Sequence, residues 1–148
     1  MKSRRRGREW AVQMLSAADL NPQQEVSELI AGFWAQLSSL EPEYGVENDV
    51  SDADARAFAE SIVSGVVGSL SEIDGAISGL LDDWDISRLG TVERVVLRIG
   101  IWEISKSNAP APVVINEAVD LVNWFSTPKS RSLVNAVLDR FAKSRNGK

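Results

Sequence analysis

Five of the sixteen Lys and Arg residues of this 148-residue chain lie within its first eight positions. They are Lys2, Arg4, Arg5, Arg6 and Arg8. Guanidinium groups are planar, permanently charged and multidentate, so the chemistry that this cluster offers is the binding of a polyanion. We expect the segment to belong to the mature fold rather than to a leader, because Glu9 and Gln13 interrupt the apolar run that a secretory signal requires.

Charge is segregated along the rest of the chain, whose formal net charge is -5. From Glu41 to Asp85 there are twelve acidic residues and one basic residue, whereas from Arg88 to Lys148 there are ten basic and five acidic residues. Binding responds to the local potential of one face rather than to the total charge. A polyanion is therefore expected to dock at the two basic ends.

The composition removes most catalytic chemistries. The sequence has no cysteine and no histidine, so Cys–His sites, Ser–His–Asp triads, disulfides and ordinary zinc sites are excluded. Acid–base work would fall to carboxylates, Lys or Tyr44, and neither a GxxxxGK[ST] loop nor a GxGxxG motif after a strand is present. We predict a protein that is not an enzyme and has no metal and no cofactor.

Apolar residues recur at spacings of three and four, and no sustained alternation of period two appears, so an all-α fold is predicted. The predicted buried stripe of the first helix is Trp10, Ala11, Met14, Leu15 and Ala18. At 100° per residue, the opposite and solvated face is Arg5, Arg6, Arg8, Glu9 and Gln13. No run approaches the roughly 20 apolar residues of a membrane span, so the expectation is a cytoplasmic protein.

Cap and breaker signals divide the remaining chain. Asn21-Pro22 predicts a second helix through roughly Ser38, followed by a surface loop from Glu41 to Asp49. Ser51 and Asp54 resemble a capping box that opens a long helix, which the glycines at positions 65, 68, 75 and 79 are expected to kink or break.

Three further helices complete the prediction. They begin at Thr91, at Pro112 and at Thr127-Pro128, and the last ends near Ser144. The total is six or seven helices in a single domain covering residues 1–148.

Several side chains are expected to be structural. Trp10, Trp34, Trp84, Trp102 and Trp124 all accompany apolar stripes, so core packing is predicted for them. Arg98 lies between apolar neighbours and is expected to form an ion pair, because charges within a core are rarely left unpaired. For Asn116, Glu117 and Asn135 we favour capping and interhelical hydrogen bonds over ligand contact.

Five segments, taken in order, carry a resemblance to a known family. They are RRRGREWAVQML at the front, AISGLLDDWDISRLG after Gly75, TVERVVLRIGIWEI, PVVINEAVDLVNWFS and SRSLVNAVLD. Together they cover nearly the whole chain and closely resemble NusB, a family of bacterial transcription antitermination factors. The resemblance implies a compact helical fold in two packed halves. It also implies a role mainly in ribosomal RNA operons, where RNA polymerase is helped to resist termination.

The partners that the resemblance implies are boxA RNA, the ribosomal protein NusE and the RNA polymerase antitermination complex. The RNA surface would comprise Arg4, Arg5, Arg6, Arg8, Gln13, Ser16, Lys129, Ser130 and Arg131. The arginines would supply affinity and Gln13 would read a base edge. The NusE surface would be centred on Glu93, with Asp82, Asp83, Asp85 and Trp102 as further contacts, since NusE-type proteins are basic.

Two positions depart from the family pattern. Ser16 stands where tyrosine is frequent and offers no stacking surface. Gly7 stands where alanine is usual, which lowers helix propensity and suggests an arm that frays when free.

Other readings stay open at this point. A helical protein-interaction scaffold with weak or lost RNA binding is one, and the helical module of an RNA methyltransferase family is another, although no cofactor-binding remainder follows here. Self-association into a homodimer through the stripe of the first helix is also left open.

Overall fold

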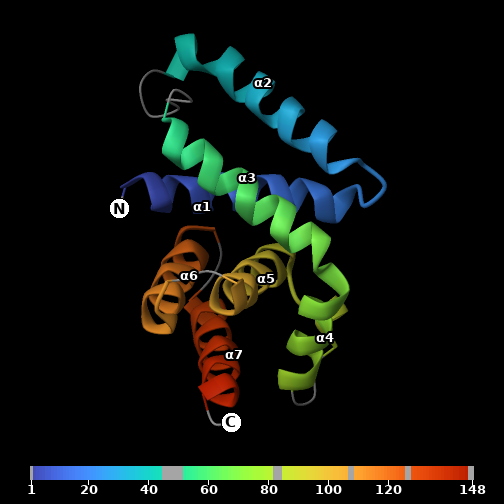
Figure 1. Ribbon diagram of the computed structural model, residues 1–148, viewed down its shortest axis with the longest axis vertical. Helices are drawn as coiled ribbons and strands as arrows, with labels where there is room; N and C mark the ends of the chain where they lie inside the picture. Colours follow the sequence, from blue (N-terminus) through green and yellow to red (C-terminus); the bar gives the residue numbers. More distant parts are fainter. Residues whose placement is uncertain (1, 45–51, 82–84, 107–108, 126–127, 147–148) are drawn as a thin grey trace. The chain divides into compact units, whose positions relative to one another are not determined.

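The computed structural model describes residues 2–44, 52–81, 85–106, 109–125 and 128–146, and all regular elements within these ranges are helical (Figure 1). The α-helices are α1 (Lys2–Leu20), α2 (Val26–Tyr44), α3 (Ala53–Gly68), α4 (Leu70–Leu80), α5 (Thr91–Lys106), α6 (Ala111–Phe125) and α7 (Pro128–Asn146). A 3-10 turn, η2 (Ile86–Arg88), precedes α5. The prediction of an all-α fold is confirmed.

The chain divides into two compact units, residues 1–64 and 65–148, and the division falls inside α3. The first unit consists of α1, α2 and most of α3. The second contains the end of α3 and all later helices. None of the described helices has the length and apolar character to cross a membrane.

Tryptophans at the centre of the first unit hold α1 against α2. Trp10 and Trp34 are buried, and their rings meet edge to face with centroids 5.0 Å apart. The indole N–H of Trp34 donates to Glu60 of α3 at 2.7 Å. This satisfies the polar atom of a buried indole, as core placement requires.

The predicted stripe of α1 is buried almost in full. Its members Trp10, Ala11, Met14 and Leu15 are at most 5% exposed. The stripe packs inside the first unit, and the homodimer stays a prediction that this structure does not test.

Gly7 marks a close approach of α1 to α3. A Cβ atom at this position would lie 2.9 Å from the carbonyl oxygen of Ala55 and 3.0 Å from the ring of Phe58. Gly7 is therefore a packing residue of the first unit, and α1 is helical from Lys2 onward.

The second helix differs from its prediction at both ends. It begins at Val26, because residues 22–24 form turns after Asn21 instead of opening the helix. It continues to Tyr44, so residues 41–44 of the predicted loop are helical, and residues 45–49 lie outside the described residues.

The start of α3 is capped by Asp52, whose carboxylate accepts from the backbone N–H of Ala55 at 3.0 Å. The same carboxylate accepts from the hydroxyl of Ser3 at 2.9 Å, which ties α1 to this cap. The capping box predicted at Ser51 lies outside the described residues. The predicted break among the glycines is confirmed, since α3 ends at Gly68 and α4 begins at Leu70.

In the second unit α5 packs against α4, α6 and α7, and Figure 1 shows α5, α6 and α7 close together. Seven of the sixteen residues of α5 are buried, as expected for a central helix. The starts predicted for these helices are correct at Thr91 and within one residue at Ala111 and Pro128.

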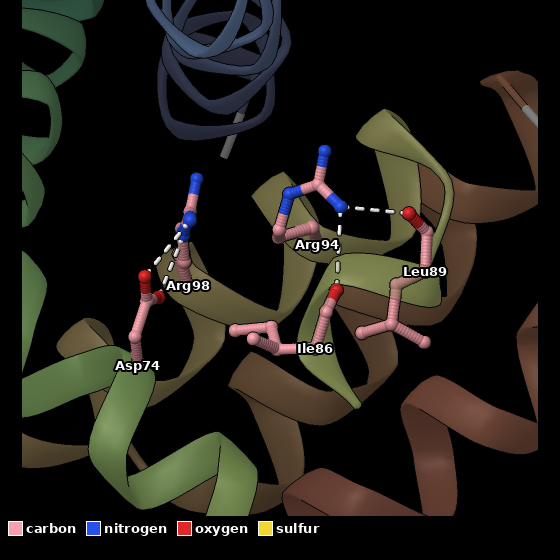
Figure 2. Close-up of polar contacts among 5 residues, drawn as sticks. All are labelled: Asp74, Ile86, Leu89, Arg94 and Arg98. Atoms are coloured by element: carbon pink, nitrogen blue, oxygen red, sulfur yellow. Dashed lines mark hydrogen bonds and ion pairs between the residues drawn. The ribbon is translucent and has the colours of Figure 1, made fainter. Parts of the chain in front are cut away.

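Two arginines fix the entry and the middle of α5, as Figure 2 shows. Arg98 forms a two-pronged ion pair with Asp74 of α4, with N–O distances of 2.8 and 2.9 Å. The predicted ion pair of Arg98 is thereby confirmed. Arg94 donates to the carbonyl of Leu89 at 2.7 Å and to that of Ile86 at 3.3 Å, which holds η2 against the helix start.

Candidate nucleic-acid interface

The basic end of α1 presents two exposed guanidinium groups, those of Arg4 and Arg5. Arg4 lies over the ring of Phe58, 4.3 Å from its centroid. Arg6 is half-buried and lies 6.0 Å from the centroid of Trp10. Cation–π contacts of this kind orient a guanidinium without neutralising its charge.

Arg8 does not lie on the solvated face where the periodicity placed it. Its side chain is only 4% exposed, and its guanidinium lies 5.2 Å from the centroid of Phe58. Val12 and Leu15 follow Arg8 at spacings of four and seven and are also buried, so the buried arc of α1 is wider than the predicted stripe. Arg8 is therefore a structural cation in this conformation.

Gln13 is exposed and Ser16 is half-exposed, three residues further along α1. Arg6, Gln13 and Ser16 repeat at spacings of seven and three, which places them along one side of the helix. Ser16 contributes a hydroxyl and no aromatic surface to this side of the helix.

At the start of α7, Lys129 and Arg131 are exposed as predicted, but Ser130 is not. Ser130 is 7% exposed, and its hydroxyl donates to the carboxylate of Glu93 on α5. Ser130 therefore links α7 to α5 in this structure, and its contact with RNA stays a prediction.

The residues predicted to face a basic protein partner lie around the start of α5. Glu93 is half-buried, with its carboxylate held by Ser130. Asp85 is exposed, and one of its oxygens accepts from the backbone N–H of Ser87 at 3.1 Å, so it also caps η2. Asp82 and Asp83 lie outside the described residues.

Trp102, also predicted as a partner contact, is half-buried near the end of α5. Its indole packs directly on Gly65, where any Cβ atom would overlap the ring. Trp102 also lines a cavity of about 160 Å³, whose further walls include Ile73 of α4 and Phe141 of α7. The core packing predicted for Trp102 is thus only partial.

Trp124 contradicts the expectation that all five tryptophans lie in the core. It is 75% exposed, in the last turn of α6, and its neighbour Phe125 is 42% exposed. The buried side of α6 is formed by Val114, Ile115, Ala118, Leu121 and Val122. Trp124 points away from that side, which a helical plot of α6 alone would have shown. Trp84 lies outside the described residues.

A concavity of about 610 Å³ lies between α6 and α7 and was not predicted. Its lining is mostly polar, and it consists of Asn116, Val119, Asp120, Pro128, Arg131, Ser132 and Asn135. Asn116 and Asn135, which we had assigned to capping and helix–helix contacts, are exposed and line this concavity.

Comparison with known proteins assigns the chain to a family. The model of the NusB family matches residues 5–143, which include Arg5, Arg6 and Arg8 of α1 and the starts of α5 and α7. The chain belongs to the NusB family. A NusB relative from Sorangium cellulosum, named transcription antitermination protein NusB, is 33% identical over 97% of this chain and 94% of its own length.

Two further NusB comparisons agree with this assignment. Transcription antitermination protein NusB of Thermodesulfovibrio yellowstonii is 32% identical over 95% of this chain and 91% of its own length. A solved structure of the antitermination factors NusB and NusE in complex with double-stranded RNA is similar with a TM-score of 0.76. That likeness covers 97% of this chain and 98% of the solved chain, at 30% identity.

Proposed function

We propose that this protein is a transcription antitermination factor that binds boxA single-stranded RNA together with NusE and helps RNA polymerase to resist termination, mainly in ribosomal RNA operons. It acts in the cytoplasm, as one RNA- and protein-binding domain, and is not an enzyme. The observation that carries the proposal is the basic end of α1, where Arg4 and Arg5 stand exposed in a chain of the NusB family.

The RNA surface of this proposal has one part in each unit. In the first unit it comprises Arg4, Arg5 and Arg6, with Gln13 and Ser16 along the same helix. In the second unit it comprises Lys129 and Arg131. Because guanidinium and ammonium groups bind phosphates without regard to sequence, these cations provide affinity, and Gln13 contributes a contact to a base edge.

Arg8 and Ser130 support this surface from below. Arg8 packs on the ring of Phe58, and Arg4 lies over the same ring. Arg8 therefore helps to hold the basic end of α1 against α3. Ser130 anchors the first turn of α7 through Glu93 and thereby positions Lys129 and Arg131 on either side of it.

The NusE surface of the proposal lies in the second unit. Glu93 and Asp85 supply negative charge near the start of α5, which favours the approach of a basic protein. Trp102 supplies an aromatic wall at the other end of α5. Its cavity, at about 160 Å³, is smaller than the about 300 Å³ at which small-molecule sites begin, and suits one apolar side chain of a partner.

The test is fluorescence anisotropy of boxA RNA and of a scrambled control, titrated with the protein with and without NusE at several salt concentrations. We expect NusE to increase the preference for boxA. The affinity should fall with salt by about 0.7 log units per decade of salt for each phosphate neutralised. Equal binding of boxA and scrambled RNA in the presence of bound NusE would instead support a protein-interaction scaffold.

The protein arm of the same titration uses Glu93→Gln. The amide retains an acceptor for Ser130 and removes only the charge, whereas a lysine would also break the link to α7. We expect weaker NusE binding with an unchanged thermal midpoint and unchanged binding of RNA alone. Unchanged NusE binding would remove Glu93 from the partner surface. Ser130→Ala serves as the control that loses the link and keeps the charge.

A further inference from the structure

Two adjacent aromatic side chains at the end of α6 are exposed to solvent. Trp124 is 75% exposed and Phe125 is 42% exposed, and no other aromatic side chain is among the large exposed apolar residues of the described chain. An exposed apolar patch indicates a binding site more strongly than buried apolar residues do. Exposing apolar surface to water is unfavourable, and a bound ligand or partner removes that surface from water.

Trp124 lies one helical turn beyond Asp120, which lines the concavity between α6 and α7. Asn116, Asp120 and Trp124 follow one another at intervals of four residues, so they form one row along α6. The first two members of the row line the concavity, and Trp124 is one turn further on. From α7, Arg131 and Asn135 line it at the same interval of four.

The chemistry of the concavity selects a class of ligand. The amides of Asn116 and Asn135 and the hydroxyl of Ser132 both donate and accept hydrogen bonds, and the carboxylate of Asp120 accepts them. A phosphate needs donors and would be repelled by Asp120. The edge of a nucleobase carries donors and acceptors together, and a carboxylate can accept from an exocyclic amino group of a base.

The volume and the charge of the concavity also fit a nucleobase. A volume of about 610 Å³ is within the about 300–1,000 Å³ range of sites for small organic groups. Arg131 lines the concavity, and Lys129 is exposed in the same first turn of α7, which provides cations for the phosphates that flank a base.

We infer that the concavity between α6 and α7 binds one unpaired base of the RNA, with the base stacked on Trp124 and its edge hydrogen-bonded by Asp120, the lining residue one turn away on α6. The inference rests on the proposed RNA-binding function and adds to it a base-reading site separate from the arginines of α1.

The test measures boxA anisotropy with Trp124→Leu and Trp124→Phe, and takes Val113→Ala as a matched control on the same helix. Val113 is exposed, at 47%, but has no aromatic ring. We expect Trp124→Leu to weaken boxA binding by about 5- to 150-fold, the range for loss of one stacked base. Trp124→Phe should retain most of the affinity, and the salt dependence should be the same for all variants.

An abasic scan of the RNA identifies the base concerned. At one position, removal of the base should weaken binding to the wild-type protein but not weaken binding to Trp124→Leu any further. If the wild-type protein prefers boxA and Trp124→Leu binds it equally tightly, the site is wrong and the proposed function stands. Weaker NusE binding with unchanged RNA binding would make Trp124 a protein contact. If the wild-type protein shows no preference for boxA, both the base-binding site and the proposed function are wrong.

Discussion

Replacing Arg4, Arg5 and Arg6 together with alanine is expected to weaken boxA RNA binding by about 100-fold at 0.1 M salt. Each single-stranded phosphate neutralised contributes about 0.7 to the slope of log affinity against log salt, so three contribute about 2 to the slope. Over the decade from 1 M to 0.1 M salt, that slope corresponds to about 2 log units of affinity. The slope itself should become shallower by about 2. Anisotropy titrations at four or more salt concentrations measure both quantities.

The matched control removes three other exposed cations, Lys106, Lys143 and Arg145, from the last turns of α5 and α7. It changes the net charge by the same amount and should leave the slope nearly unchanged. Equal losses in the two triple variants would mean that the net charge governs binding and that α1 has no special role. Arg8 is left in place, because its substitution would disturb packing around Phe58.

Substituting Gly65 with alanine is expected to lower the free energy of unfolding by about 1–3 kcal/mol, the usual cost of overpacking. A Cβ atom there would overlap the indole of Trp102, so either the ring or the end of α3 must move. For a chain of this size, each kcal/mol corresponds to a shift of roughly 2–4 °C in the thermal midpoint.

Gly68→Ala is the control for this substitution, because it makes the same change three residues later in the same helix. Nothing lies within 4 Å of a Cβ atom at position 68, so the variant should be neutral or slightly more stable. Both variants are compared by circular dichroism during thermal unfolding. Identical thermal midpoints for the two variants would show that the ring of Trp102 moves aside without loss of stability.

The sequence predicted the helices well where the periodic signal was long and the end signals were local. The all-α fold, the break after Gly68 and the starts of the last three helices follow from spacing, glycine and proline. The ion pair of Arg98 was also predictable, because a charge on a buried stripe requires a partner. Its identity, Asp74, was not, since the two residues are 24 positions apart.

The site was predicted less completely, for reasons that differ by residue. A helical wheel gives the direction of Arg8 but not the width of the buried arc, which depends on how closely α3 approaches at Gly7. The burial of Ser130 was not predicted because its partner Glu93 is 37 positions away. The prediction that Trp124 lies in the core was wrong because it relied on the residue type. The position of Trp124 on α6 is away from the buried side of that helix.

Phe58 gives the arginines of α1 a thermodynamic property as well as a position. Arg4 and Arg8 both rest on its ring, and Arg6 lies near Trp10, before any ligand is present. Ordering a long side chain at an interface costs about 0.5–1.5 kcal/mol. For Arg4 and Arg6 much of that entropy is lost when the protein folds, so less remains to be lost when RNA binds. In the proposed RNA surface, Phe58 and Trp10 thus contribute to affinity through these arginines without touching the nucleic acid.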